Sequence, residues 1–217
     1  PVSELEHEKL DGMIITGAPV ENLNFEEVNY WDEVTRIFSW ARTNVYSTLS
    51  ICWAAQAGLY YHYGVDKHPL KKKMFGVFEH TCTPIPEPIF RGFDDTFHIP
   101  HSRHTEIWRK DVLAHPKLTL LAESSECGVG IVMARNGREF FVTGHMEYSP
   151  LTLHNEYMRD YGKRDDVELP LHYYPNDDCS KEPIVKWRAH ANLFYHNWIN
   201  YYVYQQTPYN INEISEN

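Results

Sequence analysis

The sequence predicts an α/β protein in which a mostly parallel β-sheet is flanked by helices. Apolar runs at 13–16 and 48–51 are short enough to be buried strands, and each is followed by a segment with helical character. The order strand, helix, strand, helix is typical of parallel sheets, because a crossover helix returns the chain to the start of the next strand. The 217 residues, 42% of them hydrophobic, are enough for a single domain spanning 1–217.

The first expected helix follows the strand at 13–16 after a break at 17–19. Asn24 is a candidate N-cap, and Glu27 stands three residues later in the position of a capping box. Apolar residues at helical spacing then predict the buried stripe, which consists of Val28, Trp31, Val34, Ile37 and Phe38. The second expected helix follows the strand at 48–51 and runs from residue 53 to about 64, where helix formers predominate.

The rest of the chain predicts further strands and two more helices. The segment 82–88 contains three prolines and must be a loop or an edge. Strands are expected at 118–123, 130–134 and 139–143, with Asn136 and Gly137 forming the hairpin turn between the last two. Helices are expected at 150–159 and 187–204, on either side of a long loop at 169–183.

Charge and cysteine usage exclude some function classes. A net charge of −10 disfavours non-specific binding to nucleic acids or anionic membranes, which requires clustered Lys and Arg. No apolar run approaches the roughly 18 residues that a membrane-spanning helix needs. The four cysteines are widely spread and form no Cys-x-x-Cys pair, so free thiols in a reducing cytoplasm are expected.

Cys52 is the candidate nucleophile, because it lies between a strand and a helix start. A sharp strand-to-helix turn exposes such a side chain at the carboxyl edge of a sheet. The helix dipole favours a thiolate there, and the backbone N–H of Trp53 is a candidate oxyanion donor. Taken alone, a strand-end cysteine is more often a packing residue.

His145 and Glu147 supply the second part of the pattern. They follow the strand at 139–143 and are two residues apart, so an extended backbone places both side chains on one face. Glu147 can then orient the imidazole, whose other nitrogen faces a nucleophile. A surface pair is the ordinary interpretation of one His-x-Glu. Together with Cys52 it predicts a catalytic triad.

Two further segments are candidate ligand contacts. His98, His101 and His104 are spaced three residues apart, but no carboxylate or cysteine stands at ligand spacing, so we expect a substrate-contacting loop and no metal site. The lysine run 71–73 is either a solvated surface or an anion contact, and Arg159 is a candidate for binding a substrate carboxylate.

Several stretches across nearly the whole chain resemble one known family, the homoserine O-acyltransferases of methionine biosynthesis, also called homoserine transsuccinylases. The matching stretches are 11–19, 52–57, 91–95, 100–103, 142–148 and 197–205. The resemblance implies a fold like that of class I glutamine amidotransferases, which is flavodoxin-like. Family members carry a further N-terminal segment, so this chain is expected to lack part of the family domain.

The resemblance also implies roles for individual residues. Cys52 matches the acyl-carrying nucleophile, His145 the general base and Glu147 the residue that orients it. The positions associated with substrate binding are matched by Lys73, Ser102 and Arg159. Glu21 matches the position linked to acyl-donor choice, where Glu is found in members resembling acetyl-CoA users and Gly in those resembling succinyl-CoA users. A fixed carboxylate there would repel the free carboxylate of a succinyl group.

The implied function is transfer of an acetyl group from acetyl-CoA to L-homoserine through a cysteine thioester. Acetyl-CoA is a co-substrate, and no permanently bound cofactor is expected. A second copy of the chain and a separate N-terminal fragment are the candidate protein partners. Three alternatives remain open: use of succinyl-CoA, a glutamine amidotransferase domain, and a non-catalytic module. Ser50 and Ala54 disfavour the amidotransferase, which normally has glycines around its nucleophile.

Overall fold

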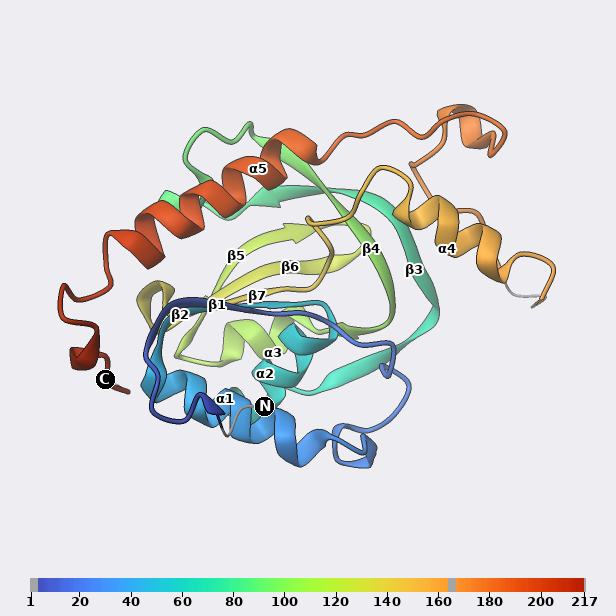
Figure 1. The fold of residues 1–217 in the computed structure, drawn as a ribbon. Helices are drawn as coiled ribbons and strands as arrows, with labels where there is room; N and C mark the ends of the chain where they lie inside the picture. The colour runs from blue at the N-terminus through green and yellow to red at the C-terminus, as the bar shows by residue number, and fades with distance from the viewer. Residues whose placement is uncertain (1–3, 164–166, 217) are drawn as a thin grey trace.

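The computed structural model describes residues 4–163 and 167–216. Its centre is a curled seven-stranded sheet with helices on both sides (Figure 1). The strands are β1 (Leu10–Ile15), β2 (Val45–Ile51), β3 (Lys67–Cys82), β4 (Thr96–Ile107), β5 (Leu118–Ser124), β6 (Gly128–Ala134) and β7 (Glu139–Val142). The longer helices are α1 (Trp31–Asn44), α2 (Trp53–Tyr63), α3 (Arg109–Ala114), α4 (Thr152–Asp160) and α5 (Arg188–Asn197), the last continuing as a π-helix over Trp198–Tyr204. Short 3₁₀ turns occupy Phe25–Glu27, Pro88–Phe90, Arg135–Gly137, Pro175–Asp177 and Ile211–Glu213.

The α/β class with helices flanking the sheet is confirmed, but the sheet is mixed. Its strand order is β1-β2-β7-β6-β5-β3-β4. Strands β1, β2 and β7 pair in parallel, whereas the other neighbouring pairs are antiparallel. The expectation of a mostly parallel sheet is therefore wrong. The alternation of strands and helices that predicts parallel pairing is confined to the N-terminal part of the chain and does not extend beyond α2.

The two faces of the sheet bury alternate residues of the same strand. Phe140 of β7 packs against Tyr202 of the π-helix, with ring centroids 4.8 Å apart. Its neighbour Phe141 faces the opposite way and packs with Leu59 of α2 and Val112 of α3. Figure 1 shows this division, with α5 on one side of the sheet and α1 to α3 on the other. Burial on both sides keeps β7 rigid, and the residues that follow it are thereby held in place.

The first predicted helix is divided in two. The capping interaction occurs as expected, since the backbone N–H of Asn24 donates to Glu27 Oε2 at 2.9 Å, but it caps only a 3₁₀ turn. Val28 is extended, and α1 begins at Trp31. Phe25 and Val28 are both buried, so their packing against Trp53 and its neighbours has overridden helical continuity. The other predicted helices and the hairpin after β6 are present, with Asn136 at φ 53°.

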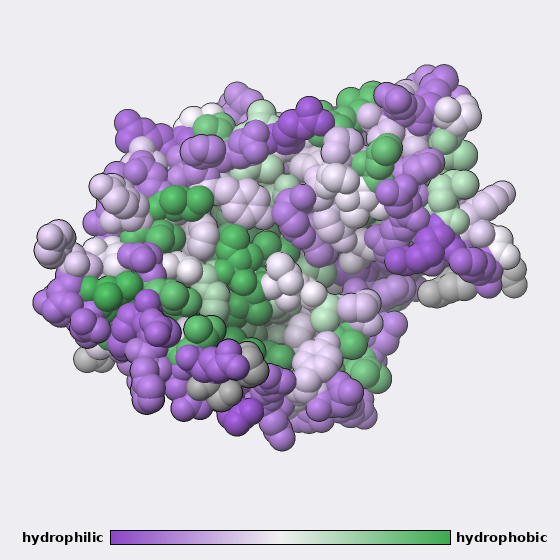
Figure 2. Space-filling model, in the orientation of Figure 1, coloured by the Kyte–Doolittle hydropathy of each residue, from purple (hydrophilic) through white to green (hydrophobic). Residues whose placement is uncertain are grey.

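The strand β1 lies at one edge of the sheet and is partly open. Ile14 remains 45% exposed there. Figure 2 shows apolar side chains gathered in the hollowed centre of this face, where β1 passes. Within the described ranges 4–163 and 167–216, no helix has the length and apolar character needed to cross a bilayer.

Candidate active site

Cys52 occupies a strained turn between β2 and α2. Its backbone torsions are φ 54° and ψ −117°, a region that residues other than glycine rarely adopt, and the residue is 4% exposed. The turn leaves little room for a side chain on the segment that passes it. A Cβ added at Gly17 would lie 3.1 Å from Cys52 Cβ and 3.2 Å from the backbone nitrogen of Trp53. The elbow predicted from the sequence is thus present, with Trp53 as the first residue of α2.

His145 and Glu147 lie beside this turn, in the segment that follows β7. His145 Nδ1 is 2.6 Å from Glu147 Oε1, and the His145 backbone N–H donates to Pro100 O at 2.8 Å. The imidazole stacks on the ring of Tyr148, with centroids 4.1 Å apart and planes 14° from parallel. The ring is therefore held by a carboxylate on one side and an aromatic face on the other. Tyr148 was not singled out from the sequence, although it directly follows the His-x-Glu motif.

The protonation of His145 depends on its two partners. Burial alone would lower its pKa, but side-chain hydrogen bonds to Cys52 and to Glu147 outweigh that effect and raise the pKa from 6.5 to about 10. His145 contacts Glu147 directly, and Cys52 is close enough to act on the pKa of the same ring, so the structure brings the three predicted residues together. At neutral pH His145 is consequently an imidazolium beside the sulfur.

We expect the pKa of His145 to fall when Cys52 is replaced with alanine, because the contributions from Cys52 are then lost. An NMR titration of the His145 ring protons measures this directly, and Cys179→Ala, at an exposed thiol, is the matched control. A raised folded-state pKa adds stability that is complete below pH 6.5 and is lost as the pH rises through about 10. The difference in free energy of unfolding between the wild type and Cys52→Ala should therefore decrease between pH 6.5 and about 10. An identical titration midpoint in both proteins would contradict the coupling.

The three predicted substrate-binding residues converge on a fourth residue, Glu156 of α4. Lys73 Nζ lies 2.5 Å from Glu156 Oε1, and the Ser102 hydroxyl donates to the same oxygen at 2.6 Å. Arg159 stands one helical turn away, with its Nη2 4.0 Å from that oxygen. The Arg159 guanidinium is itself paired with Asp160 through two hydrogen bonds of 2.8 Å. The site therefore holds a partly buried carboxylate surrounded by cations.

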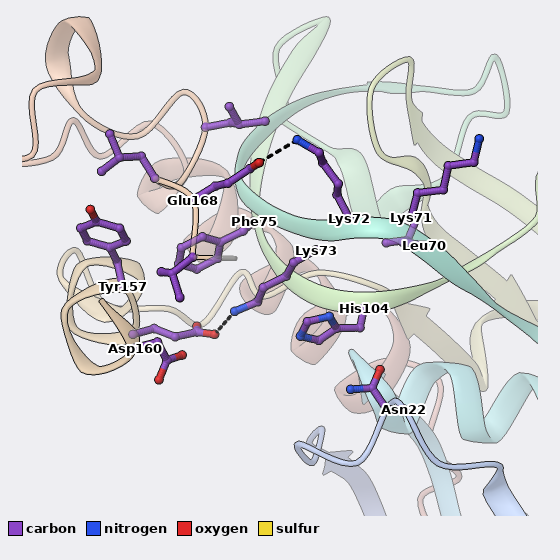
Figure 3. Close-up of a pocket in the computed structure, with 14 residues that line it drawn as sticks. Asn22, Leu70, Lys71, Lys72, Lys73, Phe75, His104, Tyr157, Asp160 and Glu168 are labelled. Carbon is purple, nitrogen blue, oxygen red and sulfur yellow. Dashed lines mark hydrogen bonds and ion pairs between the residues drawn. The ribbon is translucent and has the colours of Figure 1, made fainter. Parts of the chain in front are cut away.

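Lys73 and Glu156 of this cluster line a pocket of about 330 Å³ between β3, α4 and the segment 167–171. Figure 3 shows how differently the three lysines of the run 71–73 are placed. Lys73 reaches across the pocket toward α4, Lys72 pairs with Glu168 at 2.6 Å, and Lys71 points away. Lys73 is the lysine of this run that points toward the Glu156 cluster.

A family model described as homoserine O-succinyltransferase matches residues 1–209 of this sequence. The chain belongs to the homoserine O-succinyltransferase family. It is accordingly an acyltransferase, which agrees with the resemblance drawn from its motifs.

Relatives of the same family are named homoserine O-acetyltransferase. One from Bacteroides thetaiotaomicron is 64% identical over 211 residues, which cover 97% of this chain and 69% of that protein. One from Brevibacillus brevis is 60% identical over 209 residues, covering 96% of this chain and 68% of that protein.

Solved structures place the family fold among the glutamine amidotransferases. A glutamine amidotransferase from Thermotoga maritima gives a TM-score of 0.63 at 12% identity, covering 88% of this chain and 78% of that one. A glutamine amidotransferase from Methylobacillus flagellatus gives 0.64 at 12% identity, covering 87% and 76%. At these identities the likeness confirms the expected fold class.

Glu21, the residue that the resemblance links to donor choice, lies in the loop between β1 and α1. Lys67 at the start of β3 fastens this loop, because its ammonium donates to Glu21 O at 2.5 Å and to Leu23 O at 2.6 Å. The same ammonium lies 4.6 Å from the ring centroid of Phe25. Lys67 was not identified from the sequence, where nothing distinguishes it from a solvated lysine.

The histidine-rich segment 98–104 is not the loop that was expected. It forms part of β4, which pairs along its length with β3, and His101 is fully buried. His104 reaches the pocket, while Ser102 faces Glu156. The polar composition was misleading because the polar side chains of this strand face a buried polar cluster and the pocket.

Proposed function

We propose that this chain transfers the acetyl group of acetyl-CoA to the hydroxyl of L-homoserine, giving O-acetyl-L-homoserine for methionine biosynthesis in the cytoplasm. One observation carries the proposal: a strained, buried cysteine acts on the pKa of a histidine whose Nδ1 is bonded to a glutamate. The ion pair of Lys73 with Glu156 supports it, because these charges suit an amino acid. The names of the relatives support acetyl as the donor group.

In the first half-reaction, the Cys52 thiolate attacks the carbonyl carbon of the thioester. Negative charge develops on the carbonyl oxygen, and the backbone N–H of Trp53 at the start of α2 is the proposed donor to it. The C–S bond to coenzyme A then breaks, and the His145 imidazolium gives its proton to the departing sulfur. An acetyl thioester remains on Cys52, and His145 is left neutral.

The second half-reaction depends on the lower pKa of His145 in the acyl-enzyme. Once the sulfur carries an acetyl group, the thiolate that raised the pKa of His145 has gone, so the neutral imidazole is stabilised relative to the free enzyme. His145 then takes the proton of the homoserine hydroxyl, and the hydroxyl oxygen attacks the carbonyl carbon of the thioester on Cys52. Expulsion of O-acetylhomoserine restores the thiolate and the imidazolium. Such general-base assistance contributes about 10²–10⁴-fold.

The charges around Glu156 suit the two ends of an amino acid. We propose that the Glu156 carboxylate binds the α-ammonium of homoserine, and that Lys73, Ser102 and Arg159 bind or orient its carboxylate. In the absence of substrate these groups neutralise one another. Homoserine brings one positive and one negative group, so its binding exchanges ion pairs without leaving a charge uncompensated.

The donor preference is tested by replacing Glu21 with glycine. Removing the carboxylate removes repulsion of a succinyl carboxylate, so the ratio of succinyl-CoA to acetyl-CoA specificity constants should rise by about tenfold or more. Release of coenzyme A and the intact mass of the acyl-enzyme, measured with each donor, give the result. Leu23→Gly, at a 43% exposed side chain of the same loop, controls for loop flexibility.

Wild-type protein that forms a succinyl adduct faster than an acetyl adduct would reverse the donor assignment. The description of the matching family model makes succinyl-CoA the second candidate. Protein that forms neither adduct but hydrolyses glutamine would refute acyl transfer altogether.

A further inference from the structure

Tyr148 covers one face of the His145 imidazole, and the proposed mechanism assigns it no role. The two rings are stacked, with centroids 4.1 Å apart and planes 14° from parallel. Rings this close and this nearly parallel are in van der Waals contact across their faces. The contact between Tyr148 and the proposed general base is therefore direct.

A tight turn places Tyr148 over the imidazole. The strand β7 ends at Val142, and the chain turns at residues 146–147. The Tyr148 backbone N–H donates to His145 O at 3.4 Å, which is the i to i+3 hydrogen bond of a β-turn. The turn brings Glu147 to one nitrogen of the imidazole and Tyr148 to its face. One local structure therefore supplies both contacts of the ring.

Buried residues hold this turn in place. Met146 is 3% exposed and packs in the hydrophobic core. Trp187, just before α5, is also buried in that core, and its Nε1–H donates to Tyr148 O at 3.0 Å. On the side of β4, the His145 backbone N–H donates to Pro100 O at 2.8 Å. The backbone of Tyr148 is thus fixed from the interior of the protein, although the turn itself reaches the surface.

The Glu147 carboxylate alone is a weak restraint on the imidazole. The Glu147 side chain is 36% exposed, whereas that of His145 is 11% exposed. Water competes for an exposed carboxylate, so its ion pairs contribute little. A hydrogen bond to one ring nitrogen also leaves the ring free to tilt about that bond. The flat face of Tyr148 removes this freedom, because a tilted imidazole would either collide with the face or lose contact with it.

An aromatic face also stabilises a cationic imidazole. The face of a phenol ring is electronegative, so it attracts a cation that lies within about 6 Å of the ring centroid. The other titratable groups that face His145 are Cys52 at the elbow, Glu147 in the turn and His101 on β4. His101 is neutral at ordinary pH, because burial holds its pKa well below the usual value. Tyr148 therefore acts in the same direction as Cys52 and Glu147.

We propose that Tyr148 is a positioning residue, whose ring face keeps the His145 imidazole in one orientation and stabilises its protonated form. The inference rests on the proposed role of His145 as the proton carrier between the departing sulfur and the homoserine hydroxyl. Both half-reactions need the same nitrogen, Nε2, in the same place, since Nδ1 is bonded to Glu147. A ring that tilted between the two steps would carry its proton away from the reacting atoms.

The test compares Tyr148→Phe, which keeps the ring face, with Tyr148→Leu, which keeps an apolar side chain without one. The pKa of His145 is measured by NMR titration of the purified chain, and its resonance is assigned by the loss of that signal in His145→Gln. Tyr148→Leu should lower this pKa by about 0.5–1 pH unit, because the attraction of the ring face is lost. It should also slow formation of the acetyl-enzyme by about 10- to 100-fold. Tyr148→Phe should resemble the wild type in both measurements.

Circular dichroism establishes whether Tyr148→Leu is folded. Where it is not, replacement of Tyr148 with pentafluorophenylalanine decides the matter, because this residue keeps the shape of the ring and reverses the charge distribution over its face. It should lower the pKa of His145 relative to Tyr148→Phe. An unchanged pKa or acylation rate in folded Tyr148→Leu, an unchanged pKa in the fluorinated protein, or a Tyr148→Phe protein as impaired as Tyr148→Leu would overturn the proposal. The titration requires no acyl donor, so failure of acyl transfer appears separately, as an absent acetyl adduct on the wild type.

Discussion

Replacing Cys52 with serine is expected to remove the acyl-enzyme and to lower turnover by about four orders of magnitude. A serine hydroxyl is far less acidic than a cysteine thiol, so position 52 no longer supplies an anion at neutral pH. The contributions of the sulfur that raise the pKa of His145 are lost as well, so the variant cannot form the pair of thiolate and imidazolium. Intact mass after mixing with acetyl-CoA, and the rate of coenzyme A release with homoserine present, measure the two effects.

Cys179→Ser is the matched control for this substitution, since Cys179 is an exposed thiol. It should form the acetyl adduct and turn over as the wild type does. An acetyl adduct on the Cys52→Ser protein at the wild-type rate, or undiminished turnover, would end the proposal of a cysteine thioester.

The second large effect is expected at Glu156, where glutamine should raise the KM for homoserine by about 10- to 100-fold. A hydrogen bond to a charged group contributes about 1.5–3 kcal/mol, which corresponds to this range. The substitution keeps the size of the side chain and removes its charge, so Lys73 loses its ion pair and the substrate ammonium its counterion. Formation of the acetyl-enzyme should change little, because that step precedes homoserine binding in the proposed scheme.

Glu168→Gln provides the comparison, because Glu168 pairs with the exposed Lys72 on the rim of the same pocket. Steady-state kinetics with homoserine as the varied substrate should show a normal KM for this variant. If Glu156→Gln slowed acylation while leaving the homoserine KM unaltered, Glu156 would belong to the donor site instead.

The placement of Cys52 and His145 could be predicted because each follows a short apolar strand. Parallel neighbours bring such ends to one edge, and β2 and β7 do pair in parallel. The expected extended backbone from His145 to Glu147 is wrong, since β7 ends at Val142 and Glu147 lies in a turn. The catalytic roles inferred from this placement stay predictions until variants are measured. The ends of the predicted strands were therefore sufficient to locate the candidate nucleophile and base.

The strands β3 and β4 could not be predicted. The pocket residues that they carry could therefore not be placed either. The start of β3 carries the lysine run, and its pairing with β4 shifts register between Pro69 and Met74, so no alternation of apolar and polar residues is visible there. The end of β4 carries buried polar groups, which sequence patterns assign to loops.

Glu156 was missed for a different reason. It stands in a helix without a motif of its own, and its importance comes from Lys73 and Ser102, which are 83 and 54 residues away. Its spacing of three residues from Arg159 is the signal that could have found it, since side chains at this spacing share one helix face. Partners distant in the chain are visible only in the folded molecule.

The backbone of Cys52 sets a limit on how this enzyme can change. With φ at 54°, any side chain with a Cβ is strained at position 52, and serine inherits the same torsions as cysteine. Glycine alone would relax them, at the loss of the sulfur that is proposed to carry the acyl group. A substitution that stabilises the fold at this position would therefore remove the proposed nucleophile.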